Sequence, residues 1–320
     1  MLSTHSPIRP QLKVRVGRDG IHVFERTTGL NLLIDEARVP VEMWAASPRY
    51  VSIALTNACD LRCPYCYAPK HKATLDSKRL FAWLDELDAN GCLGVGFGGG
   101  EPTLHRDLPQ LCRYVTERTG MAVTFTTHAH RLEDRLATKL RGNVHFIRVS
   151  MDGVGETYEM LRGRSFSSLL QRFETIREIA EFGINFVVNA LTLPDLDAAL
   201  ALASQVDATE FLLLPEQPVH GRGGIDEHTM QALRGWVDTY QGTIPLSVSE
   251  TGAAGLPACN PLPRETGLRA FAHIDASGVL KRSSYDMSGV VIGAGGVMEA
   301  LNRLEPTTGE TDEDLDRIRF

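Results

Sequence analysis

The sequence predicts an α/β protein whose central part is a partial barrel of six β/α repeats. A small β element precedes this part and a β-hairpin extension follows it. Short apolar runs alternate with longer amphipathic stretches over residues 49–242, and strand-like patterns replace this alternation on both sides. Repeated β/α units form a parallel sheet with helices outside it. We therefore expect three regions, 1–48, 49–242 and 243–320.

The N-terminal region, residues 1–48, reads as short strands. Leu12, Val14 and Val16 alternate with polar residues, and Arg18-Asp19-Gly20 is typical of a turn. Two interpretations stay open for this β-rich element. It is either a lid or recognition element, or a meander that caps an open edge of the central sheet.

The six repeats are expected in strict alternation. Asp76 or Ser77 can cap the first helix and Gly91 can end it. Six units are too few to close an eight-stranded barrel, so we expect a partial TIM-like barrel. The expected strands are 51–55, 93–97, 122–126, 144–149, 185–191 and 211–214, and the expected helices are 76–90, 108–118, 133–140, 167–182, 195–205 and 226–240.

Composition bounds the class of protein. Hydrophobic residues make up 43% of the 320 residues, enough for a full core, and the net charge is −7. A negative chain has no overall electrostatic attraction to nucleic acid or to an anionic membrane. No signal peptide and no run of about 18 apolar residues is visible, so we expect no membrane span. Three of the six cysteines fall within eight positions, which suggests a metal site in a reducing, cytoplasmic setting.

The crowded cysteines are Cys59, Cys63 and Cys66, with the spacing C-x3-C-x2-C directly after the first expected barrel strand. A [4Fe–4S] cluster usually takes four thiolates. Three local cysteines leave one iron free to bind a small chelating molecule. The alternatives are a structural zinc site, with His71 or a distant residue as fourth ligand, and three inert cysteines.

A glycine-rich turn, Gly98-Gly99-Gly100-Glu101-Pro102, follows the second expected strand. Glycines let a backbone approach closely where a Cβ would clash. The Glu101 carboxylate can accept hydrogen bonds from an ammonium group, and Pro102 fixes the turn that follows. No Gly-Lys-Ser/Thr follows, so this is not a Walker A loop. A plain strand-to-helix turn is the competing interpretation.

The cysteine spacing, with Tyr65 just before the last cysteine, resembles the signature of the radical S-adenosylmethionine (SAM) superfamily. The turn with Gly99, Gly100, Glu101 and Pro102 is similar to the Gly-Gly-Glu-Pro motif of that family. The resemblance implies one [4Fe–4S] cluster on the three cysteines, whose open iron takes the amino and carboxylate groups of SAM. It places Tyr65 near the adenine and Glu101 on the SAM amino group.

The same resemblance implies the activity. Electron transfer from the cluster cleaves SAM to methionine and a 5′-deoxyadenosyl radical, which abstracts hydrogen from the substrate. A reductant such as flavodoxin or ferredoxin is implied as a partner. The cofactor supplies the difficult chemistry, and the protein supplies binding and orientation.

Further candidates stand at later strand ends. Ser150 and Asp152 close the fourth strand, and Arg162 follows. This is similar to the Ser-x-Asp-Gly and downstream arginine of family members with C-terminal SPASM extensions, which implies contacts to the SAM carboxylate or ribose. By the same resemblance Asn189 lies near the ribose and Leu214 flanks the adenine. The alternatives are an ordinary turn with a surface arginine and a plain core leucine.

His128 ends the third strand, where related enzymes have the Asn of a Thr-Asn-Gly turn, so the resemblance fails at this residue. A histidine can donate or accept a proton near neutral pH, which makes His128 a candidate catalytic residue. A structural histidine is the alternative. Glu216 and His220 are weaker candidates.

The region 243–320 resembles the beginning of a SPASM or twitch domain. Cys259 precedes an expected hairpin over 270–281, but Ser283 and Ser284 stand where a second cysteine would fall. We therefore expect a remnant that keeps part of the shape without auxiliary clusters, with Cys259 as a buried, inert thiol. The acidic end, 305–316, is expected as a solvated tail or a frayed helix.

Three functions compete. The preferred prediction is a maturase that modifies a ribosomally made peptide or protein, whose leader peptide would add a strand to the N-terminal β element. The alternative is radical modification of a small molecule such as a sugar, an amino acid or a nucleoside, which fits the expected loss of auxiliary clusters. A non-enzymatic iron–sulfur sensor is disfavoured, because a sensor does not need Glu101 or Arg162.

Overall fold

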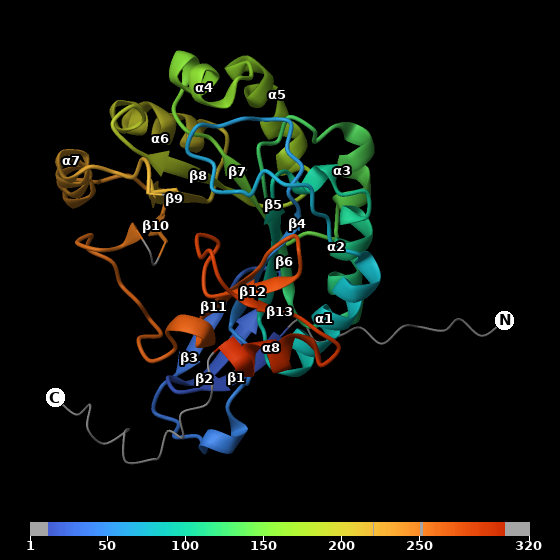
Figure 1. The fold of residues 1–320 in the computed structure, drawn as a ribbon. Helices are drawn as coiled ribbons and strands as arrows, with labels where there is room; N and C mark the ends of the chain where they lie inside the picture. The colour runs from blue at the N-terminus through green and yellow to red at the C-terminus, as the bar shows by residue number, and fades with distance from the viewer. Residues whose placement is uncertain (1–11, 220, 250–251, 305–320) are drawn as a thin grey trace.

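The computed structural model describes residues 12–219, 221–249 and 252–304. The expected acidic tail and His220 lie outside these residues. The described chain forms two sheets, one of three strands and one of ten (Figure 1). No helix among the described residues has both the length and the apolar character needed to cross a membrane.

The large sheet is the partial TIM barrel that the alternation predicts. Its strand order is β10-β9-β8-β7-β6-β5-β4-β11-β12-β13, and the strands from β4 to β10 run parallel. These seven strands are β4 (Tyr50–Thr56), β5 (Gly94–Gly99), β6 (Ala122–Thr127), β7 (Phe146–Ser150), β8 (Phe182–Val188), β9 (Glu210–Pro215) and β10 (Leu246–Val248).

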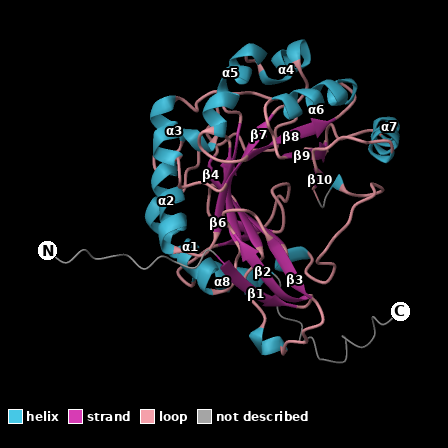
Figure 2. Ribbon diagram, turned by 180° about the vertical axis from the view of Figure 1, so that it is seen from behind, coloured by secondary structure: helices cyan, strands magenta, loops and turns pink. Residues whose placement is uncertain are grey.

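Helices cover the outer face of this sheet, as Figure 2 shows from behind. They are α1 (Ser77–Ala89), α2 (Leu108–Arg118), α3 (Asp134–Leu140), α4 (Gly155–Arg162), α5 (Phe166–Arg177), α6 (Leu196–Gln205) and α7 (Glu227–Asp238). The Asp76 side chain caps α1 by accepting hydrogen bonds from the backbone N–H groups of Lys78 and Arg79. Fully buried Ile53 and Leu55 belong to the core between sheet and helices. Their alternate neighbours on β4 therefore face the barrel interior.

Two expected boundaries are wrong. The helix expected over 167–182 ends at Arg177, and Phe182 begins strand β8. Phe182 is buried against Phe173, so this apolar residue packs strand β8 against α5 and does not continue the helix. The structure also contains two elements that the alternation did not predict, helix α4 and the short parallel strand β10.

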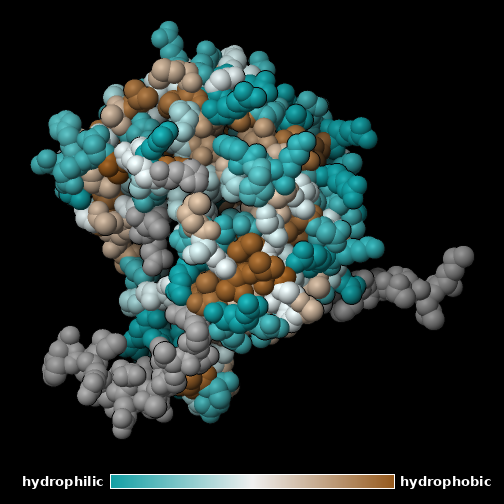
Figure 3. Space-filling view, in the orientation of Figure 1, coloured by the Kyte–Doolittle hydropathy of each residue, from teal (hydrophilic) through white to brown (hydrophobic). Residues whose placement is uncertain are grey.

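The C-terminal hairpin forms as expected, from β11 (Phe271–Ile274) and β12 (Val279–Lys281), followed by β13 (Val290–Val291) and α8 (Gly296–Leu304). It does not stand apart from the barrel. Strand β11 pairs in parallel with β4, so the hairpin extends the barrel sheet on the side where the six repeats leave it open. In Figure 3 an apolar patch lies over β12 and β13, where Val291 is exposed.

The N-terminal strands β1 (Leu12–Gly17), β2 (Gly20–Glu25) and β3 (Asn31–Ile34) form a separate antiparallel sheet, so they do not pair with an edge strand of the barrel sheet. This sheet is packed with its polar face inward. Arg15 is buried and pairs with Glu265 at 3.2 Å, while Leu12 and Val14 are more than half exposed. Strand β3 is an edge strand of this sheet.

Candidate functional site

The three cysteines of the expected cluster lie on one loop, between β4 and α1, at the carboxyl ends of the barrel strands. All three are free thiols, with Cys59 exposed and Cys63 and Cys66 partly buried. The Cys66 N–H donates to the Cys63 carbonyl at 3.2 Å, which closes a tight turn between two of them. Partial burial raises the pKa of the Cys63 thiol.

The glycine-rich turn lies directly against this loop. The Gly100 N–H donates to the Thr56 carbonyl at 2.7 Å, and the Glu101 N–H donates to the Ala58 carbonyl at 2.8 Å. A Cβ on Gly100 would come within 2.2 Å of the Ala58 oxygen, and Gly99 has φ +118°. Glycine is therefore required at both positions, because the turn packs on the backbone that leads into the cysteines. Pro102 then begins a short 3-10 helix.

The Glu101 side chain is almost fully buried, and its carboxylate is held from several directions. One oxygen, Oε1, accepts hydrogen bonds from the Thr103 N–H, the Thr103 hydroxyl and the Thr127 hydroxyl, at 3.1, 2.6 and 2.7 Å. The other, Oε2, accepts from the His128 N–H at 3.0 Å. The carboxylate is thus fixed in position at the barrel mouth, as a group that binds an ammonium must be.

A buried set of contacts, which we call the inner anchor, holds the cysteine loop against the end of β7. It consists of Tyr65, Asp152, Arg162 and Cys63. The Asp152 carboxylate accepts hydrogen bonds from the Tyr65 hydroxyl and from the Arg162 guanidinium. Arg162 Nη1 lies 3.5 Å from Cys63 Sγ. Burial, with the neighbouring Asp152 charge, raises the pKa of Tyr65, and Asp152 raises the pKa of Arg162 despite burial.

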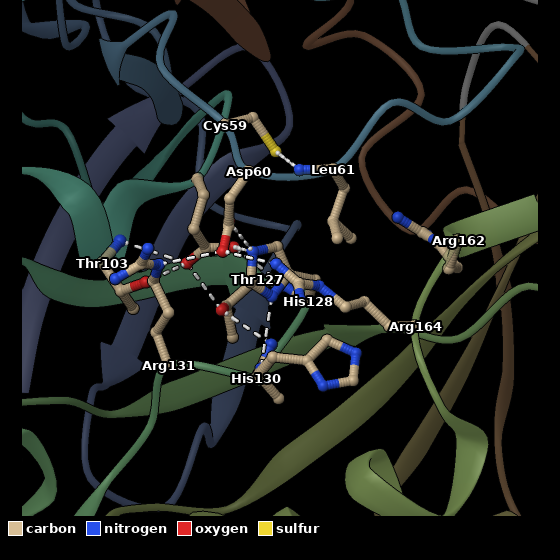
Figure 4. A network of polar contacts seen from close by, with 12 residues as sticks. Cys59, Asp60, Leu61, Thr103, Thr127, His128, His130, Arg131, Arg162 and Arg164 are labelled. Atoms are coloured by element: carbon tan, nitrogen blue, oxygen red, sulfur yellow. Dashed lines mark hydrogen bonds and ion pairs between the residues drawn. The ribbon is translucent and has the colours of Figure 1, made fainter. Parts of the chain in front are cut away.

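A second set of contacts, the outer anchor, holds the opposite side of the loop at Asp60 (Figure 4). The Asp60 carboxylate contacts His128 Nε2 at 2.9 Å, Arg131 Nε at 3.1 Å and Arg164 Nη2 at 3.2 Å. Partial burial raises the Asp60 pKa, but His128 and Arg131 together hold it below its usual value. The outer anchor joins the loop to the end of β6 and to the link between α4 and α5.

The remaining expected SAM contacts lie on the strands beyond. Ser150 ends β7 and is level with Asn185 of β8 in the sheet register. Asn189 follows β8, and its amide donates to Glu216 at 2.7 Å. Leu214 lies on β9, level with Val187. Asn189 is thus linked to Glu216, which ranked as a weak candidate in the sequence.

The residues present fit the cluster and SAM. Three thiols on one loop match the three cysteine ligands of a cluster with one open iron, because each thiolate binds a different iron. Beside Cys63, the buried Nε atom of Arg162 has no hydrogen-bond partner within the described residues. A buried donor without a partner is costly, and a ligand carboxylate would satisfy it. A Cβ at Gly98 would meet no atom within 4 Å, so the turn leaves open space there.

Sequence reasoning missed the outer anchor apart from His128. The one signal in the sequence for the outer anchor was the position of Asp60 between two of the expected cysteine ligands. Arg131 and Arg164 carry no local signal, because each meets Asp60 only through the fold. Both ring nitrogens of His128 are engaged, since Nδ1 accepts from the His130 N–H at 3.2 Å.

The other cysteines lie away from this loop. Cys92 and Cys112 are fully buried core residues, as expected. Cys259 is exposed, so the expectation of a buried thiol is wrong. Ser283, in place of an auxiliary cysteine, donates its hydroxyl to Asp286 at 3.0 Å and shapes a turn after β12.

Comparison with known families supports the motifs. The family model described as "Radical SAM superfamily" matches residues 53–200, which include the cysteine loop, the glycine turn, Asp152 and Arg162. Residues 53–200 thus form a radical SAM domain. Its expected cofactors, one [4Fe–4S] cluster and SAM, are those of this superfamily.

Several named relatives are similar to this chain over its central part. The Fe-coproporphyrin III synthase of Methanosarcina barkeri is 27% identical over 206 residues, 62% of this chain and 48% of that protein. The PqqA peptide cyclase of Rhodopseudomonas palustris is 32% identical over 51% of this chain and 46% of that protein. The mycofactocin maturase MftC of Mycolicibacterium smegmatis is 29% identical over 51% and 43%. The chain thus spans about half the length of these relatives.

Solved structures share the fold. SuiB of Streptococcus suis, bound to its precursor peptide SuiA, superposes with a TM-score of 0.73 at 13% identity, covering 93% of this chain and 88% of that chain. The protein anSMEcpe with bound AdoMet gives a TM-score of 0.55 at 17% identity, covering 75% of each chain. At this identity the likeness concerns the fold, including the partial barrel.

Proposed function

We propose that this protein is a radical SAM enzyme that reductively cleaves SAM and abstracts hydrogen from a ribosomally made peptide or protein. The observation that carries this proposal is the convergence, at one end of the barrel, of three free cysteines, the fixed Glu101 carboxylate and an Arg162 Nε donor that has no hydrogen-bond partner in the described part of the chain. When bound, the cluster and SAM supply the electron and the radical.

The chain's own residues bind and orient. Cys59, Cys63 and Cys66 hold the cluster, and Glu101 receives the SAM amino group. Arg162, already fixed by Asp152, offers its free Nε to the SAM carboxylate. Tyr65 lies beside Arg162 and borders the adenine. Ser150, Asn189 and Leu214 line the ribose and adenine side.

A peptide substrate is supported by two independent observations. Two of the relatives are named as a peptide cyclase and a maturase, and SuiB is solved with its precursor peptide. In this chain the N-terminal sheet exposes Leu12, Val14 and Leu32 on one face, beside the edge strand β3. An extended peptide that paired with β3 would complete the edge and cover these side chains.

A second candidate is radical modification of a small molecule. The observation in its favour is that two relatives from Methanosarcina barkeri are named Fe-coproporphyrin III synthase and AdoMet-dependent heme synthase. Ser283 and Ser284, in place of auxiliary cysteines, agree with single-cluster chemistry. This second candidate keeps the same cofactor site and differs only in what enters the barrel.

The chemistry is tested by anaerobic reconstitution of the protein, iron counting and a dithionite assay for 5′-deoxyadenosine. We expect about four irons per chain and release of 5′-deoxyadenosine. The Cys63→Ala variant should lose both the cluster and SAM cleavage, whereas Cys112→Ala, at a core cysteine, should keep the cluster. Unchanged iron content in Cys63→Ala would refute the assignment, and about eight irons would refute the single-cluster prediction.

The substrate class is tested with fluorescent precursor peptides encoded beside the gene. Leu32→Asp should weaken peptide binding about tenfold, because it puts a charge on the apolar face. Met160→Asp, at an exposed position on α4, is the control and should not change binding. Binding of a tetrapyrrole with no peptide binding would favour the second candidate. The reductant we propose is a flavodoxin or ferredoxin, and the free cysteines fit a reducing cytoplasm.

A further inference from the structure

His128 occupies a position between the two halves of the proposed cofactor site. Its ring is nearly fully buried, at 3% side-chain exposure. The His130 N–H donates to Nδ1, so that nitrogen carries no proton, and the proton of the neutral ring is on Nε2. Nε2 is 2.9 Å from Asp60 Oδ1 and 3.3 Å from Glu101 Oε2. One N–H therefore faces two carboxylates.

Those two carboxylates belong to different parts of the site, as Figure 4 shows for the Asp60 side. Asp60 lies in the cysteine loop, between Cys59 and Cys63. Glu101 ends the glycine turn. The backbone N–H of His128 also donates to Glu101 at 3.0 Å, so this residue holds Glu101 with its main chain and Asp60 with its ring.

The backbone beside His128 is strained. Ala129 has φ 68°, in the left-handed region that residues with a Cβ rarely adopt, and it is fully buried. Such a conformation is less favourable than the right-handed one, because the Cβ comes close to the following carbonyl oxygen. The Thr127 hydroxyl accepts a hydrogen bond from the Ala129 N–H at 2.9 Å while donating to Glu101. The turn places the His130 N–H against His128 Nδ1, and this contact together with the one to Asp60 holds the ring in position.

We propose that His128 is a positioning residue that couples the cysteine loop to Glu101, so that cluster binding and SAM binding depend on one imidazole. This inference rests on the proposed function and replaces the expectation that His128 is a catalytic residue that donates or accepts a proton. With both ring nitrogens engaged, the side chain has no free site for a substrate proton. Within the described residues, the side chains of Arg131 and Arg164 donate to Asp60 and not to Glu101, so they hold the loop without reaching Glu101.

The coupling has a physical basis in preorganisation. A loop with three cysteines must be ordered when it binds a cluster, and contacts made beforehand reduce that entropic cost. Groups that orient metal ligands from behind typically change metal affinity by about 10–100-fold when removed. Loss of the ring would leave Asp60 with only its exposed arginine contacts and would remove one neighbour of Glu101 at once.

The test compares His128→Leu, His128→Gln and Asp60→Asn, with His130→Gln as the matched control. His130 is two residues away and contacts Tyr158 and Ser168 instead of the loop. Three measurements are made: iron loss to a chelator, SAM affinity by equilibrium titration, and proteolysis of the cluster-free protein within residues 57–76. None of them requires turnover.

We expect His128→Leu to lose iron about tenfold faster and to bind SAM about tenfold more weakly, with faster cleavage of the loop. Asp60→Asn should change iron loss and cleavage while leaving SAM affinity close to wild type. His128→Gln keeps an N–H donor, so it should keep much of the wild-type iron retention and much of the wild-type SAM affinity. His130→Gln should match the wild type.

Wild-type iron retention, SAM affinity and loop cleavage in a folded His128→Leu would overturn the coupling. So would a loss in His130→Gln equal to that in His128→Leu. Should His128→Leu not fold, Asp60→Asn decides, because the His128 ring reaches the loop through Asp60: wild-type iron retention and loop cleavage in that variant would overturn the coupling. Failure of the proposed function looks different: the wild-type protein would bind no cluster, while the cleavage comparison of the cluster-free variants would still report on the anchor.

Discussion

The inner and outer anchors hold the same cysteine loop with similar chemistry but in different surroundings. Both centre on an aspartate that accepts from arginine. In the inner anchor Asp152 is 1% exposed and Arg162 11% exposed, whereas in the outer anchor Arg131 and Arg164 are both nearly half exposed. Only His128 is buried on the outer side.

This difference in burial separates the expected roles. A buried charge without its partner is strongly destabilising, because nothing compensates for the lost hydration. An exposed ion pair contributes little, since water and salt screen it. We therefore expect the inner anchor to contribute to the free energy of unfolding and to SAM affinity. The exposed arginines of the outer anchor should affect only the order of the cysteine loop.

The largest effect is expected for Asp152→Ala. This change leaves the Arg162 guanidinium buried without a carboxylate and removes acceptors for the Tyr65 hydroxyl and the Val187 N–H. The free energy of unfolding should fall by about 3–5 kcal/mol, measured by urea denaturation of the cluster-free protein. Glu227→Ala, which breaks an exposed pair with Arg234, is the control and should be close to neutral. Equal losses of unfolding free energy in Asp152→Ala and Glu227→Ala would contradict the expected difference between buried and exposed ion pairs.

Arg162→Lys comes next and acts mainly on the cofactor. Lysine keeps the charge but loses the planar set of donors that reaches Asp152 and Cys63 together. SAM affinity should fall about tenfold, the lower range for groups that orient a metal site, while the fold persists. Equilibrium titration with SAM measures this. Unchanged affinity would mean that the free Nε does not receive the SAM carboxylate.

The residues of the inner anchor could be named from the sequence, as expected SAM contacts and a cluster ligand, and those of the outer anchor mostly could not. Asp152 and Arg162 follow one strand within eleven positions, so a local motif contains both. Asp60 and Arg164 are separated by about a hundred positions, and no local pattern pairs them. Their contact depends on α4, a helix that the alternation did not predict.

The N-terminal sheet gives the same lesson for the fold. The alternation of Leu12, Val14 and Val16 predicts a strand with two unlike faces, and the strand is there. Alternation does not say which face is buried. Arg15 faces inward because Glu265, far along the chain, supplies its partner, and the apolar face is left exposed.

Tyr65→Phe should have a smaller effect than either change above. It removes the hydroxyl that donates to Asp152 but keeps the ring beside Arg162. Because Arg162 still satisfies Asp152, the free energy of unfolding should fall by about 1 kcal/mol, the net value of one hydrogen bond. Thermal unfolding of the cluster-free protein measures it. A loss as large as that of Asp152→Ala would show that the tyrosine, and not the arginine, stabilises the buried carboxylate.

The smallest effect is expected for Arg164→Ala on the outer side. Its pair with Asp60 is exposed, and Asp60 keeps His128 and Arg131. The free energy of unfolding should change by less than about 1 kcal/mol, and the difference should shrink as salt is raised. Iron loss to a chelator at low and high salt is the sharper measurement, because it reports on the cysteine loop and not on the stability of the whole protein. If Arg164→Ala lost iron as fast as His128→Leu at every salt concentration, burial would not be what distinguishes the two anchors.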